Sequence, residues 1–130
     1  MLHHPHNMLC LISCNINKNR AQVAILDFGS QYSHLIARRV REMQVYCELY
    51  SCLVSAEELG KHTLTAITLS GGPNSVYEEG APHVSKEIWE MIKEREIPVL
   101  GICYGMQVSF YKGHGICLSE GDYSLPFILA

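Results

Sequence analysis

The stretch Ile97-Pro-Val-Leu-Gly-Ile-Cys103-Tyr-Gly105 decides the fold of this chain. Its apolar first half is typical of a strand that is buried on both faces of a parallel sheet. The residues that follow have the Gly-x-Cys-x-Gly spacing of a nucleophile elbow, a tight strand-to-helix turn that lifts one reactive side chain above a sheet. The stretch therefore predicts an α/β fold and makes Cys103 the candidate catalytic nucleophile.

Upstream of this stretch, short apolar runs alternate with segments of helical periodicity. The expected strands cover residues 22–27, 45–50, 66–70 and 97–102. The expected helices cover residues 31–43, 55–60 and 82–95. This alternation predicts a doubly wound, flavodoxin-like and mostly parallel sheet with helices on both faces.

Capping residues predict where the helices begin. Ser30 is the expected N-cap of the first helix, at whose far end Met43 should face inward. Ser55 opens the second helix, because Glu58 follows three residues later as in a capping box. Pro82 is expected to start the third helix, since proline is favoured in the first turn.

Three loops should meet at the carboxyl edge of the sheet, where ligands bind in such folds. They cover residues 28–31, 71–75 and 103–107. The backbone N–H of Tyr104 should point to where an oxyanion forms, and the Gly71-Gly72 pair can supply a second donor. The elbow by itself leaves a second interpretation open, because a free cysteine at a strand end is often simply buried.

The composition is that of a globular domain, with 48% hydrophobic and 18% charged residues among 130. A formal charge of −3 argues against nucleic acid or an anionic membrane as the partner. No apolar run is long enough to cross a membrane, so a cytoplasmic protein is expected.

The cysteines favour a reducing compartment with free thiols, because the apolar runs can form a core without disulfides. No Cys-x-x-Cys pair is present, so we expect no metal site. The six cysteines are Cys10, Cys14, Cys47, Cys52, Cys103 and Cys117. Residues 1–20 contain no acidic residue. We interpret them as a disordered tail, with an organellar leader as the alternative.

Other titratable residues are weaker candidates for acid–base chemistry. The adjacent acids Glu57-Glu58 and Glu78-Glu79 are typical of solvated helix and loop charges. Exposed positions are expected for the histidines upstream of the elbow, namely His34, His62 and His83. His114 follows Cys103 closely and stays open as a base, although the glycines on both sides of it favour a turn.

Three segments resemble the GMP synthetase family. They are ILDFGSQY (25–32), LSGGPNSVY (69–77) and LGICYGMQ (100–107). Members of this family begin with a class I glutamine amidotransferase domain, and the pairing of the first and third segments is specific to them. The resemblance implies that residues 21–107 form the first part of this domain. It also leaves 108–130 as a divergent C-terminal segment, so the domain is expected to be truncated. The sheet would then be incomplete, with its fourth strand as an unpaired edge.

The resemblance implies a glutaminase. Cys103 would attack the side-chain amide of glutamine, release ammonia and form a γ-glutamyl thioester that water cleaves to glutamate. The N–H groups of Gly72 and Tyr104 would stabilise the oxyanion, and Gln107 would help to hold the substrate. Ammonia would pass to a synthetase domain that uses ATP and magnesium to convert xanthosine 5′-monophosphate (XMP) to GMP. No cofactor is expected in the segment itself.

The family activates its cysteine with a histidine that a glutamate two residues later orients. No His-x-Glu occurs in this sequence, so we expect the chain to be inactive by itself, since losing the base costs orders of magnitude in rate. Two alternatives to the glutaminase stay open. One is a non-catalytic fragment or binding module, and the other is an unrelated cysteine hydrolase that uses His114.

Overall fold

The structure is a computed structural model that describes residues 20–110 and 127–129. Our predictions for the tail, for His114, for Cys10, Cys14 and Cys117, and for most of the divergent segment lie outside these residues. The strands are β1 (Gln22–Asp27), β2 (Cys47–Ser51), β3 (Leu64–Leu69), β4 (Val99–Gly101) and β5 (Phe127–Leu129). The helices are α2 (Ser33–Glu42), α3 (Ala56–Gly60), α4 (Lys86–Glu94) and α5 (Tyr104–Phe110).

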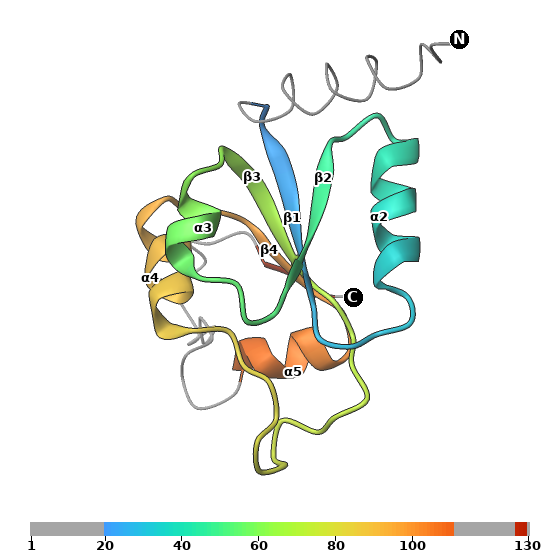
Figure 1. Cartoon of the computed structure of the whole chain (residues 1–130), viewed down its shortest axis with the longest axis vertical. Coiled ribbons are helices and arrows are strands. Elements are labelled where there is room, and N and C mark those ends of the chain that lie inside the picture. The colour runs from blue at the N-terminus through green and yellow to red at the C-terminus, as the bar shows by residue number, and fades with distance from the viewer. Residues whose placement is uncertain (1–19, 111–126, 130) are drawn as a thin grey trace, which may run out of the picture.

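The strands form one sheet in the order β2-β1-β3-β4-β5, and every neighbouring pair is parallel (Figure 1). This is the flavodoxin-like order of a doubly wound fold, as expected from the alternation of strands and helices. The chain reverses its direction of winding between β1 and β3. In folds of this order, the ends of the two strands at the reversal open a crevice in which ligands bind.

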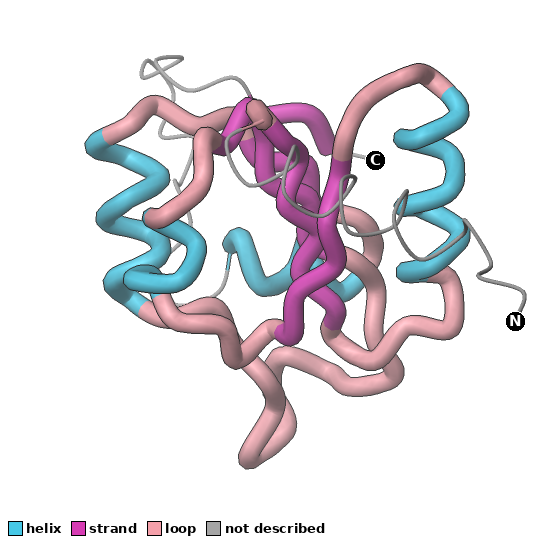
Figure 2. The backbone as a smooth tube through the Cα atoms, turned by 45° about the horizontal axis from the view of Figure 1, so that its top comes forward, coloured by secondary structure: helices cyan, strands magenta, loops and turns pink. Residues whose placement is uncertain are grey.

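Helices cover both faces of the sheet because side chains along each strand alternate between them. On one face, Ile25 and Cys47 pack with Ala37 of α2. On the other, Leu26 and Ile67 belong to a larger core with residues of α3, α4 and α5. Figure 2 shows the same arrangement, with the strands between the helices.

Two of the helix starts differ from the sequence prediction. Ser30 does not cap α2. Its Oγ accepts a hydrogen bond from the N–H of Tyr32 at 3.0 Å, and Tyr32 is the N-cap without a side-chain bond. Pro82 does not begin α4, which starts at Lys86 because Ser85 provides the cap. The carbonyl oxygen of Pro82 instead accepts a hydrogen bond from Tyr104.

The prediction for the second helix is confirmed, since Ser55 Oγ accepts from the N–H of Glu58 at 3.1 Å. The prediction that Met43 faces inward is wrong. This side chain is 69% exposed, because α2 ends one residue earlier, at Glu42.

The expectation of an unpaired fourth strand is also wrong. β5 pairs with β4 in parallel, with Val99 opposite Phe127 and Gly101 opposite Leu129. Backbone hydrogen bonding therefore continues past β4. The three residues of β5 come from the segment that the sequence marked as divergent.

Candidate active site

Cys103 occupies the turn between β4 and α5, and its backbone has φ +51°. This left-handed conformation is strained for a residue with a β-carbon, and such strain concentrates at functional sites. The side chain is exposed. The turn thus presents the Cys103 thiol above the carboxyl edge of the sheet, as a nucleophile elbow does.

Glycine is required on both sides of the elbow. A β-carbon added at Gly101 would lie 2.8 Å from the Cα of Met106, inside the first turn of α5. One added at Gly105 would overlap the carbonyl oxygen of Leu69 at the end of β3. The absence of side chains at Gly101 and Gly105 therefore lets α5 pack directly against the neighbouring strand.

The Gly71-Gly72 loop lies beside the elbow. A β-carbon at Gly71 would be 3.7 Å from Cβ of Cys103 and 3.7 Å from Oγ of Ser30. One at Gly72 would be 2.5 Å from the carbonyl oxygen of Phe28, so this position also excludes a side chain. Among the backbone hydrogen bonds of the described residues, neither the N–H of Gly72 nor that of Tyr104 donates. Both N–H groups are thus available to a ligand.

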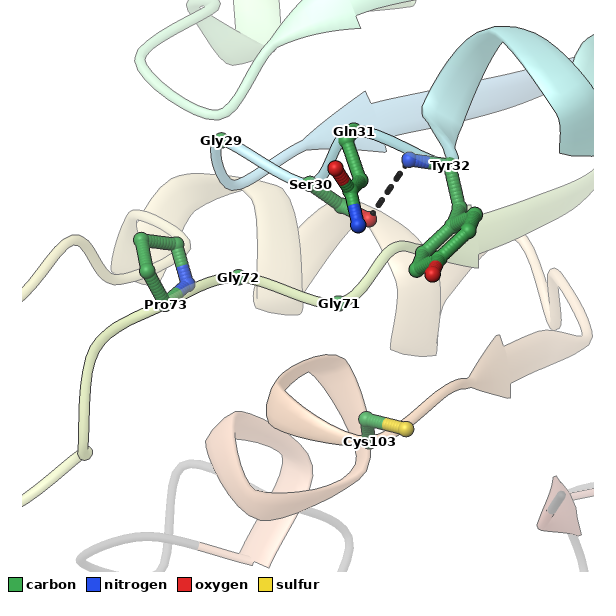
Figure 3. A pocket seen from close by; sticks show the side chains of 8 residues that line it. All are labelled: Gly29, Ser30, Gln31, Tyr32, Gly71, Gly72, Pro73 and Cys103. Atoms are coloured by element: carbon green, nitrogen blue, oxygen red, sulfur yellow. Dashed lines mark hydrogen bonds between the residues drawn. The ribbon is translucent and has the colours of Figure 1, made fainter.

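These loops enclose a cleft of about 420 Å³ (Figure 3). Its walls come from the residues after β1, β3 and β4, that is, from the edge of the sheet where the winding reverses. The lining residues are Gly29, Ser30, Gln31, Tyr32, Gly71, Gly72, Pro73 and Cys103. The cleft is large enough for a small metabolite.

A buried polar network holds the loops together. Asp27 Oδ1 accepts hydrogen bonds from Ser33 Oγ at 2.7 Å and from the N–H of Gly29 at 2.9 Å. Ser33 Oγ is also 3.1 Å from Ser70 Oγ, and Ser70 Oγ accepts from the N–H of Phe28 at 3.2 Å. Because buried hydroxyls need partners, this network fixes the end of β1 against the end of β3.

The side chain of Tyr104 points away from the cleft. Its hydroxyl donates to the carbonyl oxygen of Pro82 at 2.7 Å, and its ring packs against that of Phe28 with centroids 5.5 Å apart. Burial raises the pKa of this phenol above its usual value. The side chain of Tyr104 therefore does not line the cleft, and the role of its backbone N–H as an oxyanion donor stays a prediction.

The structure brings Cys103 and Gly72 together in the cleft, but it places Gln107 differently. The N–H of Gln107 donates to the carbonyl oxygen of Cys103 at 3.2 Å, one helical turn on. Its side chain is exposed and does not line the cleft in the described part of the structure. A role for Gln107 in holding substrate stays a prediction.

Sequence reasoning located the loop after β1 but did not single out Ser30, Gln31 or Tyr32 as residues that line a site. Figure 3 shows their side chains on the β1–α2 loop, across the Gly71-Gly72 segment from Cys103. Their position directly after a buried strand was the available signal, because loops after parallel strands converge.

The remaining titratable candidates lie elsewhere. None of the described histidines, His34, His62 and His83, lines the cleft. Glu58 pairs with Lys61 at 2.7 Å, and Glu78 accepts a hydrogen bond from Asn74. Cys47, Cys52 and Cys103, the cysteines within the described ranges, are free thiols. No helix of the described chain has the length and apolar character to cross a membrane.

Residues 24–121 match the family model described as glutamine amidotransferase class-I. The chain is 56% identical over 90 residues to the GMP synthase (glutamine-hydrolysing) of Gloeothece citriformis, covering 69% of the chain and 16% of that protein. It is 54% identical over 107 residues to the enzyme of the same name from Nostoc punctiforme, covering 81% of the chain and 19% of that protein. The chain thus spans less than a fifth of the length of these two relatives.

A solved structure supports the fold. A putative GMP synthase subunit from Thermoplasma acidophilum superposes with a TM-score of 0.55 at 28% identity, covering 68% of this chain and 42% of that one.

The family match extends beyond Gln107, where the resemblance of the sequence was expected to stop. The domain boundary at that residue stays a prediction.

Proposed function

Because the chain belongs to the class I glutamine amidotransferase family, we propose that Cys103 is the nucleophile that hydrolyses glutamine in a GMP synthase. The observation that carries this proposal is the strained conformation of Cys103, with φ +51°, in a cleft that Gly72 also lines. Among the described residues, the N–H groups of Gly72 and of the adjacent Tyr104 donate to no backbone acceptor. A thiol fixed in this way is positioned to attack a carbonyl carbon. The same N–H groups are positioned to bind the oxygen that becomes negatively charged.

The chemistry proceeds in two steps. The thiolate of Cys103 adds to the amide carbon of glutamine, and the electron pair of the C=O bond moves to its oxygen, which the N–H groups of Gly72 and Tyr104 stabilise. Collapse breaks the C–N bond, and the nitrogen leaves with a proton as ammonia. Water then cleaves the thioester, so that glutamine and water yield glutamate and ammonia. Gln107 is proposed to help hold the substrate from the first turn of α5.

The general base is not supplied by the described residues that line the cleft, since these include no histidine or carboxylate. We therefore propose that the chain supplies the nucleophile and the oxyanion donors, and that it turns over glutamine very slowly by itself. Removing the base of a triad leaves only the contribution of binding and the oxyanion hole.

A glutamine analogue with a diazoketone in place of the amide tests the site without turnover. Its diazo carbon takes up a proton, and the sulfur then displaces N₂ to form a thioether. We expect peptide mass spectrometry to find the adduct on Cys103 and glutamine to protect against it. The Cys52→Ser variant is the matched control and should keep the label, whereas Cys103→Ala should lose it. Labelling that glutamine does not reduce would reject the proposed substrate.

We further propose that the ammonia serves a synthetase domain or partner that uses ATP and magnesium to aminate XMP to GMP, a ligase reaction, in the cytoplasm. The names of the relatives support the link between glutamine hydrolysis and GMP synthesis in this proposal. Adding the chain to the synthetase portion of a relative tests it. GMP formation from ammonium should not need the chain. Formation from glutamine should rise measurably but only slightly with it, because turnover is slow without the base, and this rise should require Cys103. No increase with glutamine would contradict the coupling.

A further inference from the structure

Phe28, the first residue after β1, contacts three parts of the site at once. Its side chain is only 3% exposed. Its N–H donates to Ser70 Oγ at 3.2 Å. Its carbonyl oxygen would be 2.5 Å from a β-carbon at Gly72, so the two backbones are in direct contact. Its ring packs against the ring of Tyr104 at 5.5 Å, with an angle of 55° between the planes.

The contacts of Phe28 matter because the two oxyanion donors belong to different loops. The N–H of Gly72 follows β3, and that of Tyr104 begins α5 after β4. Two donors can bind the same oxygen only when the distance between them stays within about 0.5 Å of its productive value. The backbone of Phe28 limits how far Gly72 can move inward, and its ring fixes the tyrosine to which the second N–H belongs.

We propose that Phe28 is a positioning residue that sets the separation of the two oxyanion donors, Gly72 and Tyr104. The proposal rests on the assignment of these N–H groups to the oxyanion in the proposed function. Phe28 does not line the cleft, and it acts through the backbone of Gly72 and the ring of Tyr104. The tilted ring pair adds directional packing to this contact, since aromatic rings attract each other edge to face.

The alternative is that Phe28 only contributes to core packing, as any other buried residue of the same core does. Ile92, on the far turn of α4, is such a residue and is 0% exposed. The Ile92→Val variant therefore serves as the control for a loss of core packing. Phe28→Leu keeps an apolar side chain but removes the ring that meets Tyr104. Phe28→Met is the milder second variant, because it keeps a long apolar side chain and removes only the aromatic ring.

Two reagents separate the roles in the full chain. The diazoketone analogue of glutamine has a ketone oxygen that needs both donors, whereas iodoacetamide alkylates a thiol by displacement and needs neither. Phe28→Leu should slow diazoketone labelling of Cys103 by about tenfold or more, as expected when an oxyanion donor is displaced. The iodoacetamide rate should stay at the wild-type value. Ile92→Val should change neither rate.

An equal fall in both rates, or the same selective fall in Ile92→Val, would overturn the proposal.

Crystal structures of the wild type and Phe28→Leu give a second readout that does not involve glutamine. The separation of the Gly72 and Tyr104 nitrogens should differ by about 0.5 Å or more, and an unchanged separation would also overturn the proposal. If the wild type reacts only with iodoacetamide, the proposed substrate fails, and the crystallographic comparison still decides the role of Phe28. Phe28→Met replaces Phe28→Leu in both measurements if the latter does not fold.

Discussion

The Oγ atoms of Ser33 and Ser70 lie 3.1 Å apart in the interior of the protein, and this contact joins the first turn of α2 to the end of β3. Both side chains are fully buried. Ser33 also donates to Asp27, and Ser70 also accepts from Phe28. The two hydroxyls therefore connect the loop that lines one wall of the cleft with the loop that carries Gly72.

Removing either hydroxyl should destabilise the protein, and the two losses should not add. We expect Ser33→Ala and Ser70→Ala each to lower the free energy of unfolding by about 1 to 2 kcal/mol, because each removes hydrogen bonds from a buried network. The double variant should lose at least about 0.5 kcal/mol less than the sum, since both hydroxyls belong to one network. Urea unfolding of the four proteins measures this coupling. Strict additivity would show that the two serines act independently.

Because the backbone of Cys103 is strained, a substitution there that relieves the strain should raise the stability of the protein while removing its reactivity. Replacing Cys103 by glycine should raise the free energy of unfolding by about 0.5 to 1 kcal/mol, because glycine adopts a positive φ without strain but is more flexible when unfolded. The same variant should lose labelling by the diazoketone analogue completely. Urea unfolding and mass spectrometry give the two readouts.

Cys103→Ala is the matched control, since it removes the thiol but keeps the β-carbon. It should lose the label without the gain in stability. Equal stability of the glycine and alanine variants would mean that the backbone conformation at this residue is not strained.

Much of the fold could be predicted because the hydrophobic pattern reports directly on burial. The run from Gln22 to Asp27 was predicted as a strand and is β1, with the same ends. Cys103 was predicted at the turn after β4 from the glycines on both sides of it. The structure gives the reason for this pattern, since a β-carbon at Gly101 or Gly105 would clash with neighbouring backbone. Residue spacing records such local constraints, so sequence reasoning found them.

What the sequence did not reveal depends on contacts between distant residues. The start of α4 was misplaced at Pro82 because nothing local shows that its carbonyl oxygen accepts a hydrogen bond from Tyr104. The pairing of β5 with β4 was missed for the same reason. The three contacts of Phe28 likewise join positions up to 76 residues apart, since 104 − 28 = 76, and no motif marks them.

Gly105 and Gly80 are glycines for different reasons. A side chain at Gly105 has no space, whereas Gly80 has space but a positive φ. Gly105→Ala should lower the free energy of unfolding by about 3 kcal/mol or more, because its β-carbon would overlap the backbone of Leu69 and α5 would have to move. Gly80→Ala should cost only about 1 kcal/mol, since φ is +76° there but no atom lies within 4 Å of the added carbon. Thermal or urea unfolding measures both. A smaller loss for Gly105→Ala than for Gly80→Ala would show that α5 does not pack on β3 as described.

Alkaline pH should remove one contribution to stability that arises far from the cleft. Burial, and then the hydrogen bond to Glu48, raise the pKa of Tyr46 to about 12. The folded protein holds this proton more tightly than the unfolded chain, whose tyrosines titrate near pH 10. The contribution of the Tyr46 hydroxyl is therefore complete below about pH 10 and is lost as the pH rises towards 12.

At neutral pH, Tyr46→Phe should be less stable than the wild type by about 1 kcal/mol. Urea unfolding at a series of pH values should show this gap closing above about pH 10 and reversing towards pH 12, because ionisation of the partly buried phenol destabilises only the wild type. A gap that stays constant up to pH 12 would contradict the raised pKa.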